Sequence, residues 1–352
     1  MRKSFLLIAT IVTFAAGCKK ETTEITASPS QQSIDQLAQT ANLSVCMGNT
    51  WAYDQATPAT EDDPTLVYNN KAYVFQSSDW YHISIFDGTT WTTIGMLSPL
   101  GEQHPDFCFA IGNKGYFGFS LNVTKGFWEY DFVTGAWSPK ANFPGLPRFE
   151  PATFTIGNKG YLVAGAYITN TNYLNYGDTW EYDPANNVWT QKASFPLFVL
   201  GRFRATGFAI GNMGYIVNGQ YAAGNNLNNP ADQYLLKSLM QYDPAADAWT
   251  IKANFPGNGR YQSSCFVISG LAYVGGGMVN GFSSYNDFYK YYPASDTWLA
   301  IPDIPLTYHF RTISFVISSK GYIGYDNLNH PYDVKLVKYT PLTCSLPPPS
   351  YQ

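Results

Sequence analysis

The chain has few charged side chains, few histidines and no basic segment. Of its 352 residues 13% are charged, with 25 acidic and 21 basic residues and a formal net charge of −4. Nucleic-acid recognition depends on clustered Lys and Arg, so we expect no nucleic-acid partner. Only four histidines and five cysteines occur, and there is no nucleophile motif, phosphate loop or catalytic carboxylate pair. We therefore expect neither a metal nor a cofactor.

Long apolar runs are also missing beyond the first 18 residues. The opening MRKSFLLIATIVTFAAGC joins two basic residues to an apolar run too short to span a membrane. We interpret residues 1–17 as a signal peptide. Its ending AAGC resembles a bacterial lipobox, which implies lipidation of Cys18; a plain signal peptide with a chance cysteine is the alternative.

The segment after Cys18 is polar. Residues 18–44 are rich in Ser, Thr and Gln, and this composition is typical of a flexible tether. Lys19, by resemblance to lipoprotein sorting patterns, implies the outer membrane of a Gram-negative bacterium. The leaflet, periplasmic or surface-exposed, is left open. We expect contact with the membrane through the lipid anchor alone.

Aromatic residues are abundant, at 17% with 27 Tyr, and such residues favour strands. The stretch DTWEYDPANNVWTQKASFP at 178–196 returns as LMQYDPAADAWTIKANFP at 239–256 and as DFYKYYPASDTWLAIPDIP at 287–305. A second motif, an apolar strand and a tight turn ending in a tyrosine, precedes each copy. Its tyrosines are Tyr73, Tyr116, Tyr161, Tyr215, Tyr273 and Tyr322. A period of about 50 residues indicates a repeat architecture.

Each repeat predicts four strands in two hairpins. In the first strand large and small residues alternate, and period two places them on opposite faces of the sheet. The large residues are Phe109, Phe154, Phe208, Phe266 and Phe315; the small ones are Cys108, Thr153, Gly207, Cys265 and Ser314. A ring of sheets needs this alternation, because the bulky face of one sheet fills the hollow of the next. We predict an all-β propeller of antiparallel four-stranded blades.

The repeats resemble kelch repeats, whose pattern is an apolar strand, a Tyr, a Gly pair, then Tyr-Asp and Trp. The resemblance covers residues 48–341, although only Gly275–Gly276 supplies the Gly pair cleanly. It implies a kelch-type propeller of the galactose-oxidase/kelch-like superfamily, and it implies little about function because the motif residues are structural.

Six anchor tyrosines predict six blades in a propeller of residues 45–344, followed by a disordered tail at 345–352. The last repeat lacks its Trp strand, so the segment around Trp51 is expected to complete it and close the ring. Cys46 and Cys344 flank the predicted closing pair, and a disulfide is plausible there in an oxidising compartment. Cys108 and Cys265 are expected to be buried free thiols.

The candidate binding residues lie in the links that enter the innermost strands. Eight residues before the anchor Ile stand Arg148, Arg202, Arg260 and His309; six before it stand Glu150, Arg204, Gln262 and Arg311. Converging arginines at the channel mouth can bind a carboxylate, phosphate or sugar. The alternative is that each arginine satisfies nearby carbonyls or Glu150 and joins the blades. Tyr173 and Tyr221, in longer loops, suit sugar stacking or protein contact, with a solvated loop as the alternative.

These patterns support three functional hypotheses. The leading one is a lipid-anchored, monomeric, non-catalytic binding module of the cell envelope, with a glycan or an envelope protein over the channel mouth. The second is an enzyme resembling kelch-type sialic acid mutarotases, in which Glu150 acts as general acid/base and Arg204 holds a sugar carboxylate. The third is a purely structural role.

Overall fold

A computed structural model describes residues 45–58, 63–76, 82–95, 99, 105–119, 126–169, 173–196, 200–223, 233–279, 283–305, 313–327 and 330–345. The predicted signal peptide and the whole predicted tether, including Cys18, lie outside them. Residues 47–343 form one compact unit; residues 1–46 and 344–352 belong to a second. In the part that the structure describes, no helix is long and apolar enough to cross a membrane.

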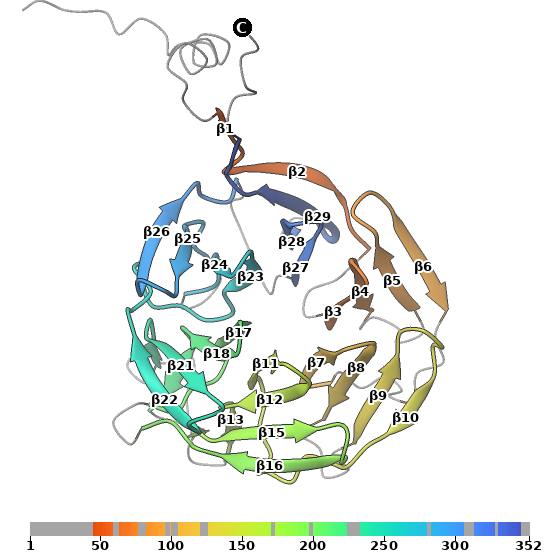
Figure 1. The fold of residues 1–352 in the computed structure, drawn as a ribbon, viewed down its shortest axis with the longest axis vertical. Helices are drawn as coiled ribbons and strands as arrows, with labels where there is room; N and C mark the ends of the chain where they lie inside the picture. Colours follow the sequence, from red (N-terminus) through yellow and green to blue (C-terminus); the bar gives the residue numbers. More distant parts are fainter. Residues whose placement is uncertain are drawn as a thin grey trace, which may run out of the picture. The chain divides into compact units, whose positions relative to one another are not determined.

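The larger unit is a ring of six four-stranded antiparallel sheets (Figure 1). Blade one comprises β3 (Thr65–Tyr68), β4 (Lys71–Phe75), β5 (His82–Phe86) and β6 (Trp91–Gly95). Blade two comprises β7 (Phe107–Ile111), β8 (Lys114–Gly118), β9 (Phe127–Asp131) and β10 (Trp137–Pro139). Blade three comprises β11 (Ala152–Ile156), β12 (Lys159–Val163), β15 (Thr179–Asp183) and β16 (Val188–Lys192).

Blade four comprises β17 (Thr206–Ile210), β18 (Met213–Val217), β21 (Leu239–Asp243) and β22 (Ala248–Lys252). Blade five comprises β23 (Ser264–Ile268), β24 (Leu271–Gly275), β25 (Phe288–Tyr292) and β26 (Thr297–Ile301). Blade six comprises β27 (Ile313–Ile317), β28 (Lys320–Asn327), β29 (His330–Thr340) and β2 (Thr50–Ala56). The predicted six-bladed propeller is confirmed.

The ring closes as predicted, with an N-terminal strand completing the last blade. β2 pairs antiparallel with β29, Trp51 opposite Tyr339 and Ala52 opposite Lys338 (Figure 1). A separate two-stranded sheet is formed by β1 (Val45–Met47) and β30 (Thr343–Ser345). These strands contain Cys46 and Cys344, whose side chains lie outside what the structure describes, so the disulfide stays a prediction.

Blades stack through a phenylalanine of one innermost strand and a glycine of the next blade's second strand. A Cβ on Gly160 would lie 2.2 Å from the ring of Phe109, and one on Gly214 would lie 2.2 Å from the ring of Phe154. Blades one and five carry alanine at this position, Ala72 and Ala272. The contact confirms the predicted alternation of bulky and hollow faces and explains why the motif reads Gly-Tyr in four blades.

The repeated Tyr-Asp and Trp pattern builds a clamp between neighbouring blades. In blade three the Tyr182 hydroxyl donates to the Asn187 side-chain oxygen, which also accepts the backbone N–H of Ala141 in blade two. Trp189 donates its indole N–H to the carbonyl of the same Ala141. The backbone of one residue, Ala141, is thus held through both its N–H and its carbonyl oxygen.

The clamp recurs around most of the ring. In blade four, Asp247 accepts the N–H of Ala193 and Trp249 donates to its carbonyl. In blade five, Asp296 and Trp298 hold Ala253 in the same way. Trp51 repeats the indole bond to the Pro302 carbonyl of blade five at 2.8 Å. The indole nitrogens of Trp91 and Trp137 have no partner among the described residues, so the weaker sequence copies lack the clamp.

The small residues of the first strands allow those strands to crowd together. A Cβ on Gly207 would lie 2.4 Å from the Thr153 carbonyl oxygen of the neighbouring blade. Thr153 itself donates to the Cys108 carbonyl at 2.8 Å. Cys108 and Cys265 are free thiols, as predicted, and half-buried rather than fully buried. Desolvation raises the pKa of Cys108 to about 12 and that of Cys265 further, which makes both poor nucleophiles.

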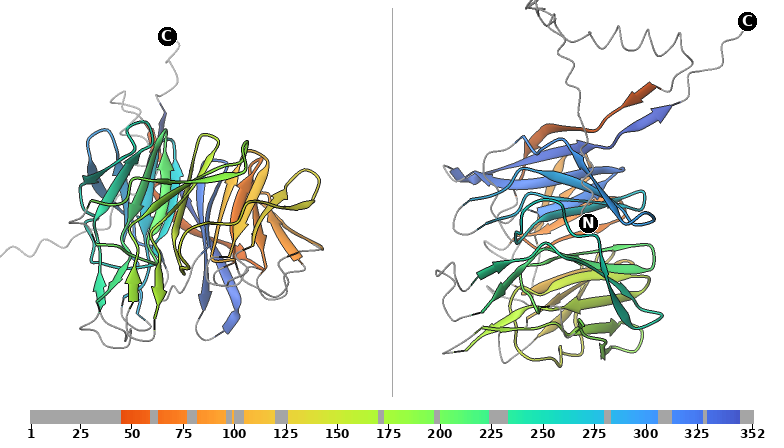
Figure 2. Two further views of the ribbon diagram at one scale, coloured as in Figure 1. Left: turned by 90° about the horizontal axis from the view of Figure 1, so that it is seen from below. Right: turned by 90° about the vertical axis from the view of Figure 1, so that its left-hand side faces the viewer.

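Two extra hairpins extend blades three and four on one face of the ring (Figure 2). They are β13 (Ala166–Ile168) with β14 (Tyr173–Asn175), and β19 (Gln220–Ala222) with β20 (Gln233–Leu235). Asn175 joins them, because its side-chain amide donates to the Ala222 carbonyl and its oxygen accepts the Ala222 N–H. The long loops of the sequence therefore contain β-structure.

Candidate functional site

The first set of predicted binding arginines is buried within the blades. Arg148, Arg202 and Arg260 are at most 1% exposed. Each donates Nη1 to the carbonyl of the residue 16 positions further along the chain. The arginines thus satisfy nearby carbonyls, which was the alternative that the sequence left open. The expectation that these three side chains surround the open mouth of the channel is therefore wrong. Their equal spacing from the strands conceals the fact that they point into the blade.

The second set converges, as expected. Glu150, Arg204 and Gln262 each stand two residues before an innermost strand, β11, β17 or β23. Arg204 donates Nε to Glu150 Oε2 at 2.7 Å, and the Gln262 side-chain amide donates to the same oxygen at 3.4 Å. Glu150 and Gln262 come from non-adjacent blades, so the contact requires a position close to the ring axis. We call these three residues the axial triad.

The backbone holds the axial triad in a conformation that is unusual for its residue types. The φ angles are +47° at Glu150, +57° at Arg204 and +52° at Gln262, in the left-handed region that favours glycine. The Arg204 N–H donates to the Glu150 carbonyl and the Gln262 N–H to the Arg204 carbonyl. Strained backbone of this kind costs about 1–3 kcal/mol per residue and concentrates at functional sites.

Aromatic rings pack against the Arg204 side chain of the axial triad. The Arg204 guanidinium lies over the rings of Phe203 at 5.5 Å and Tyr261 at 5.2 Å. Tyr173 of β14 stacks on Phe203 with centroids 5.9 Å apart and an interplanar angle of 18°. Tyr173 therefore lies beside the triad, as a binding residue would. Burial raises the pKa of its hydroxyl, and the Arg204 charge partly opposes the shift.

The supporting aromatics could have been found in the sequence. Each triad residue follows an aromatic residue and an arginine, in the triplets RFE, RFR and RYQ at 148–150, 202–204 and 260–262. The side chain at the first position of each triplet points into the blade, the second residue is aromatic, and the side chain at the third position reaches the axis of the propeller. Residues spaced by two lie on one side of an extended chain, and the positive φ at the third position breaks that rule.

Other predicted residues are placed elsewhere or lie outside the described residues. Tyr221 of β19 contacts Tyr234 of β20, with centroids 6.0 Å apart, rather than a residue of the axial triad. Tyr176 packs on the Arg148 guanidinium at 4.5 Å. His309 and Arg311 lie outside the described residues, so their predicted place at the axis is untested.

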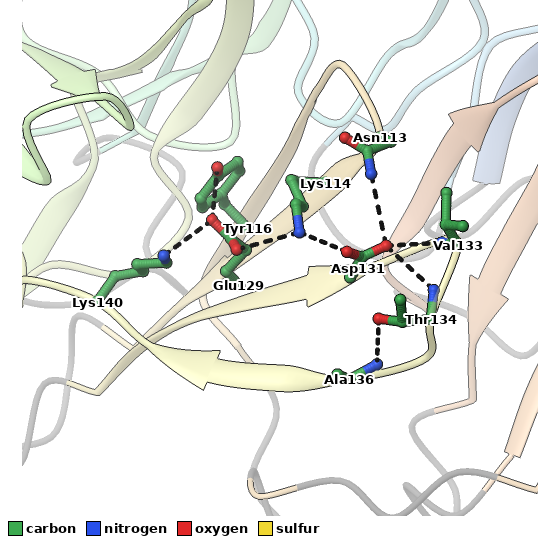
Figure 3. Close-up of polar contacts among 9 residues, drawn as sticks. All are labelled: Asn113, Lys114, Tyr116, Glu129, Asp131, Val133, Thr134, Ala136 and Lys140. Carbon is green, nitrogen blue, oxygen red and sulfur yellow. Dashed lines mark hydrogen bonds and ion pairs between the residues drawn. The ribbon is translucent and has the colours of Figure 1, made fainter.

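The acidic residues of the Tyr-Asp motif are structural, as predicted. In blade two Asp131 accepts from Lys114 and from the backbone N–H groups of Val133 and Thr134 in the following turn (Figure 3). The neighbouring Glu129 accepts from Tyr116. These bonds fasten the outer hairpin to the second strand. In the described part of the chain no cluster of three His, Cys, Asp or Glu side chains is arranged to hold a metal.

Chemically, the axial triad offers a carboxylate and a guanidinium, with the aromatic ring of Tyr173 nearby. The Glu150 side chain is 31% exposed and that of Arg204 21% exposed, so both are accessible from solvent. Arg204 suits an anionic oxygen, and Glu150 suits a hydroxyl or a transferable proton. Phe203 and Tyr261 are buried beneath the guanidinium, whereas the half-buried Tyr173 gives a sugar ring an apolar surface to pack on.

The six sheets and the closing strand define the class: this is a six-bladed β-propeller, and its repeats resemble kelch repeats. The sequence matches no protein-family model. It is 25% identical over 172 residues to the N-acetylneuraminate epimerase of Yersinia enterocolitica, covering 42% of each chain. It is 25% identical over 195 residues to that of Pasteurella multocida, covering 48% of this chain and 51% of the relative.

Kelch-like protein 25 of Xenopus tropicalis is 32% identical over 116 residues, 33% of this chain and 18% of that protein. The chain thus matches about half or less of the length of these curated relatives. Among solved structures, one described as "Structure of YjhT" superimposes with a TM-score of 0.63 at 14% identity, covering 82% of this chain and 98% of the other. That likeness concerns the fold.

Proposed function

We propose that the chain is a carbohydrate-binding propeller that takes an acidic sugar or glycan at the axial triad. The observation that carries the proposal is the convergence of Glu150, Arg204 and Gln262 from three blades, each in a strained left-handed conformation. A propeller does not need a Glu and an Arg there, since glycine adopts this backbone freely. Their presence is explained if their side chains act on a ligand.

The ligand class follows from the hydrogen-bonding groups of the axial triad and from the neighbouring Tyr173 ring. Arg204 suits a carboxylate, Gln262 and Glu150 suit hydroxyls, and the half-buried Tyr173, which stacks on the buried Phe203, suits the apolar side of a sugar. The relatives named N-acetylneuraminate epimerase are named for an acidic sugar, and this supports the same class.

Titration calorimetry with N-acetylneuraminate and the neutral N-acetylglucosamine tests the binding. We expect the acidic sugar to bind more tightly, and Arg204→Gln to weaken it about 10- to 100-fold, the value of one charge-assisted hydrogen bond. The control is Lys192→Gln, which removes a cation from the outer strand β16 and should leave affinity unchanged. Equal affinity of the Arg204→Gln variant and the wild type would remove the axial triad from the site.

The second candidate is mutarotation of that sugar, and the named relatives favour it. Glu150 would transfer the proton at the anomeric hydroxyl, while Arg204 holds the carboxylate. NMR exchange spectroscopy of the two anomers measures the rate. Glu150→Gln should abolish the acceleration and retain binding, because the amide keeps the shape of the carboxylate. Binding without any acceleration by the wild type would leave a non-catalytic module.

We further propose that the protein works at the cell envelope, anchored by lipid at Cys18, with a glycan or an envelope protein as partner. The lipobox-like AAGC and the polar tether support this. Mass spectrometry of the N-terminal peptide from cells should show a diacyl or triacyl modification on Cys18. A Cys18→Ala variant should lose its membrane association, and an unmodified mature N-terminus in the wild type would contradict the anchor.

A further inference from the structure

Three blades contain the same buried arginine, and two of them neutralise it with an aspartate. In blade three Arg148 donates Nη1 and Nη2 to the two carboxylate oxygens of Asp178 at 2.6 and 2.8 Å. In blade five Arg260 makes the same pair with Asp287 at 2.6 and 2.9 Å. Each aspartate directly precedes the third strand of its blade, β15 or β25.

Blade four has the arginine without the aspartate. Ser238 precedes β21 at the equivalent position, and Arg202 donates Nη2 to its hydroxyl at 2.9 Å and Nη1 to the Asn218 carbonyl at 3.0 Å. Among the residues that the structure describes, no carboxylate forms an ion pair with Arg202, which is 1% exposed. Burial lowers the pKa of Arg202 to about 10, so the side chain remains a cation at neutral pH.

One donor of this buried cation is unused. The Arg202 Nε has no hydrogen-bond partner, whereas Arg148 and Arg260 direct Nε to the carbonyls of Leu146 and Asn258. Nε and Nη2 share one edge of the planar guanidinium, and Nη2 is the atom that reaches the Ser238 hydroxyl. That hydroxyl accepts from Arg202 and keeps its own proton to donate. Two donors therefore stand beside an uncompensated charge.

The side chains around Arg202 are also smaller than around its equivalents. Tyr176 and Tyr285 cover Arg148 and Arg260 at 4.5 and 4.2 Å. Leu236 occupies the equivalent position in blade four. The equivalence follows from the backbone, because the N–H groups of Tyr176, Leu236 and Tyr285 donate to the carbonyls of Gly165, Gly219 and Gly277, respectively. Blade four thus replaces Asp by Ser and Tyr by Leu, and both changes remove atoms close to the guanidinium.

We propose that blade four binds a small monovalent anion, such as chloride, against Arg202 Nε and the Ser238 hydroxyl. The anion supplies the negative charge that aspartate supplies in blades three and five, because an unpaired buried cation is strongly unfavourable. The near-complete burial of Arg202 restricts the ligand to a few atoms. The site is separate from the axial triad and does not depend on the proposed function.

Crystals of the wild-type protein grown in bromide test the site directly. We expect an anomalous peak at hydrogen-bond distance from Arg202 Nε and the Ser238 hydroxyl, and no equivalent peak at Arg148 or Arg260. A water without anomalous signal at this position would overturn the proposal. Thermal unfolding of the wild type should give a Tm about 2–4 °C higher in sodium chloride than in sodium gluconate at equal ionic strength.

Two substitutions of Ser238 isolate the charge. Ser238→Asp should raise the Tm in gluconate and abolish the difference between the two salts, because it recreates the aspartate of blades three and five. Ser238→Asn has the same shape without the charge and should not stabilise the protein in gluconate. Equal Tm values for the two variants, or a wild-type Tm that is the same in both salts, would contradict anion binding.

Discussion

At the residue scale, half-buried carboxylates of the outer hairpins are kept ionised chiefly by hydrogen bonds from lysines. A hydrogen bond from Lys114, the largest effect, lowers the pKa of Asp131 to about 2, and one from Lys159 does the same for Asp183. Because these folded-state pKa values lie below the ordinary value of about 3.9, the stabilisation is present above pH 4 and is lost as the pH falls towards 2.

Lys114→Gln should raise the pKa of Asp131 towards its ordinary value and leave that of Asp183 unchanged. The two carboxylates are in different blades, so the second is an internal control. NMR titration of the side-chain carboxyl carbons measures both values. An Asp131 pKa that stays near 2 in the variant would show that the turn N–H groups of Val133 and Thr134, and not Lys114, dominate.

At the element scale, the joint between two blades depends on an indole that the sequence pattern marks. Trp249 donates Nε1 to the Ala193 carbonyl and to the Thr179 hydroxyl, each at 3.0 Å. Trp249→Phe removes both bonds and leaves the half-buried Ala193 carbonyl without this partner, so we expect a loss of about 2–4 kcal/mol in the free energy of unfolding. Urea denaturation measures it.

Trp137→Phe is the matched control, because it makes the same substitution at a tryptophan whose indole nitrogen has no hydrogen-bond partner. Its loss should be smaller by at least about 1 kcal/mol, the value of a net hydrogen bond. Equal losses would mean that ring volume alone holds the blades together.

Much of this element-scale structure was predictable. Period-two alternation placed Phe154 and its equivalents on one face, and the structure confirms their role as knobs against the next blade. The clamp on Ala141 was beyond prediction, because the two side chains that bind the backbone of this residue lie 46 and 48 positions further along the chain. Such contacts are set by how closely neighbouring blades approach, and local sequence does not contain that distance.

At the scale of the whole molecule, the closing strand determines whether β29 has an exposed edge. Without β2, the backbone groups of β29 that face β2 would be unpaired, while those facing β28 would keep their partners. Unpaired edges promote aggregation. A chain beginning at residue 57 should lose cooperative unfolding or aggregate, whereas one beginning at residue 45 should unfold in a single transition. Circular dichroism with light scattering distinguishes these outcomes. A soluble, cooperative chain from residue 57 would show that closure is dispensable.

The sequence by itself determined the repeat, the number of blades and the closing role of Trp51, because periodic hydrophobic patterns encode strands and their faces. It also singled out both sets of link residues. Only the tertiary structure decided between them: Arg148, Arg202 and Arg260 turn into the blades, while Glu150, Arg204 and Gln262 meet at the axis. The physical reason is a positive φ at each of the latter positions, which redirects a side chain without leaving a mark in the residue spacing.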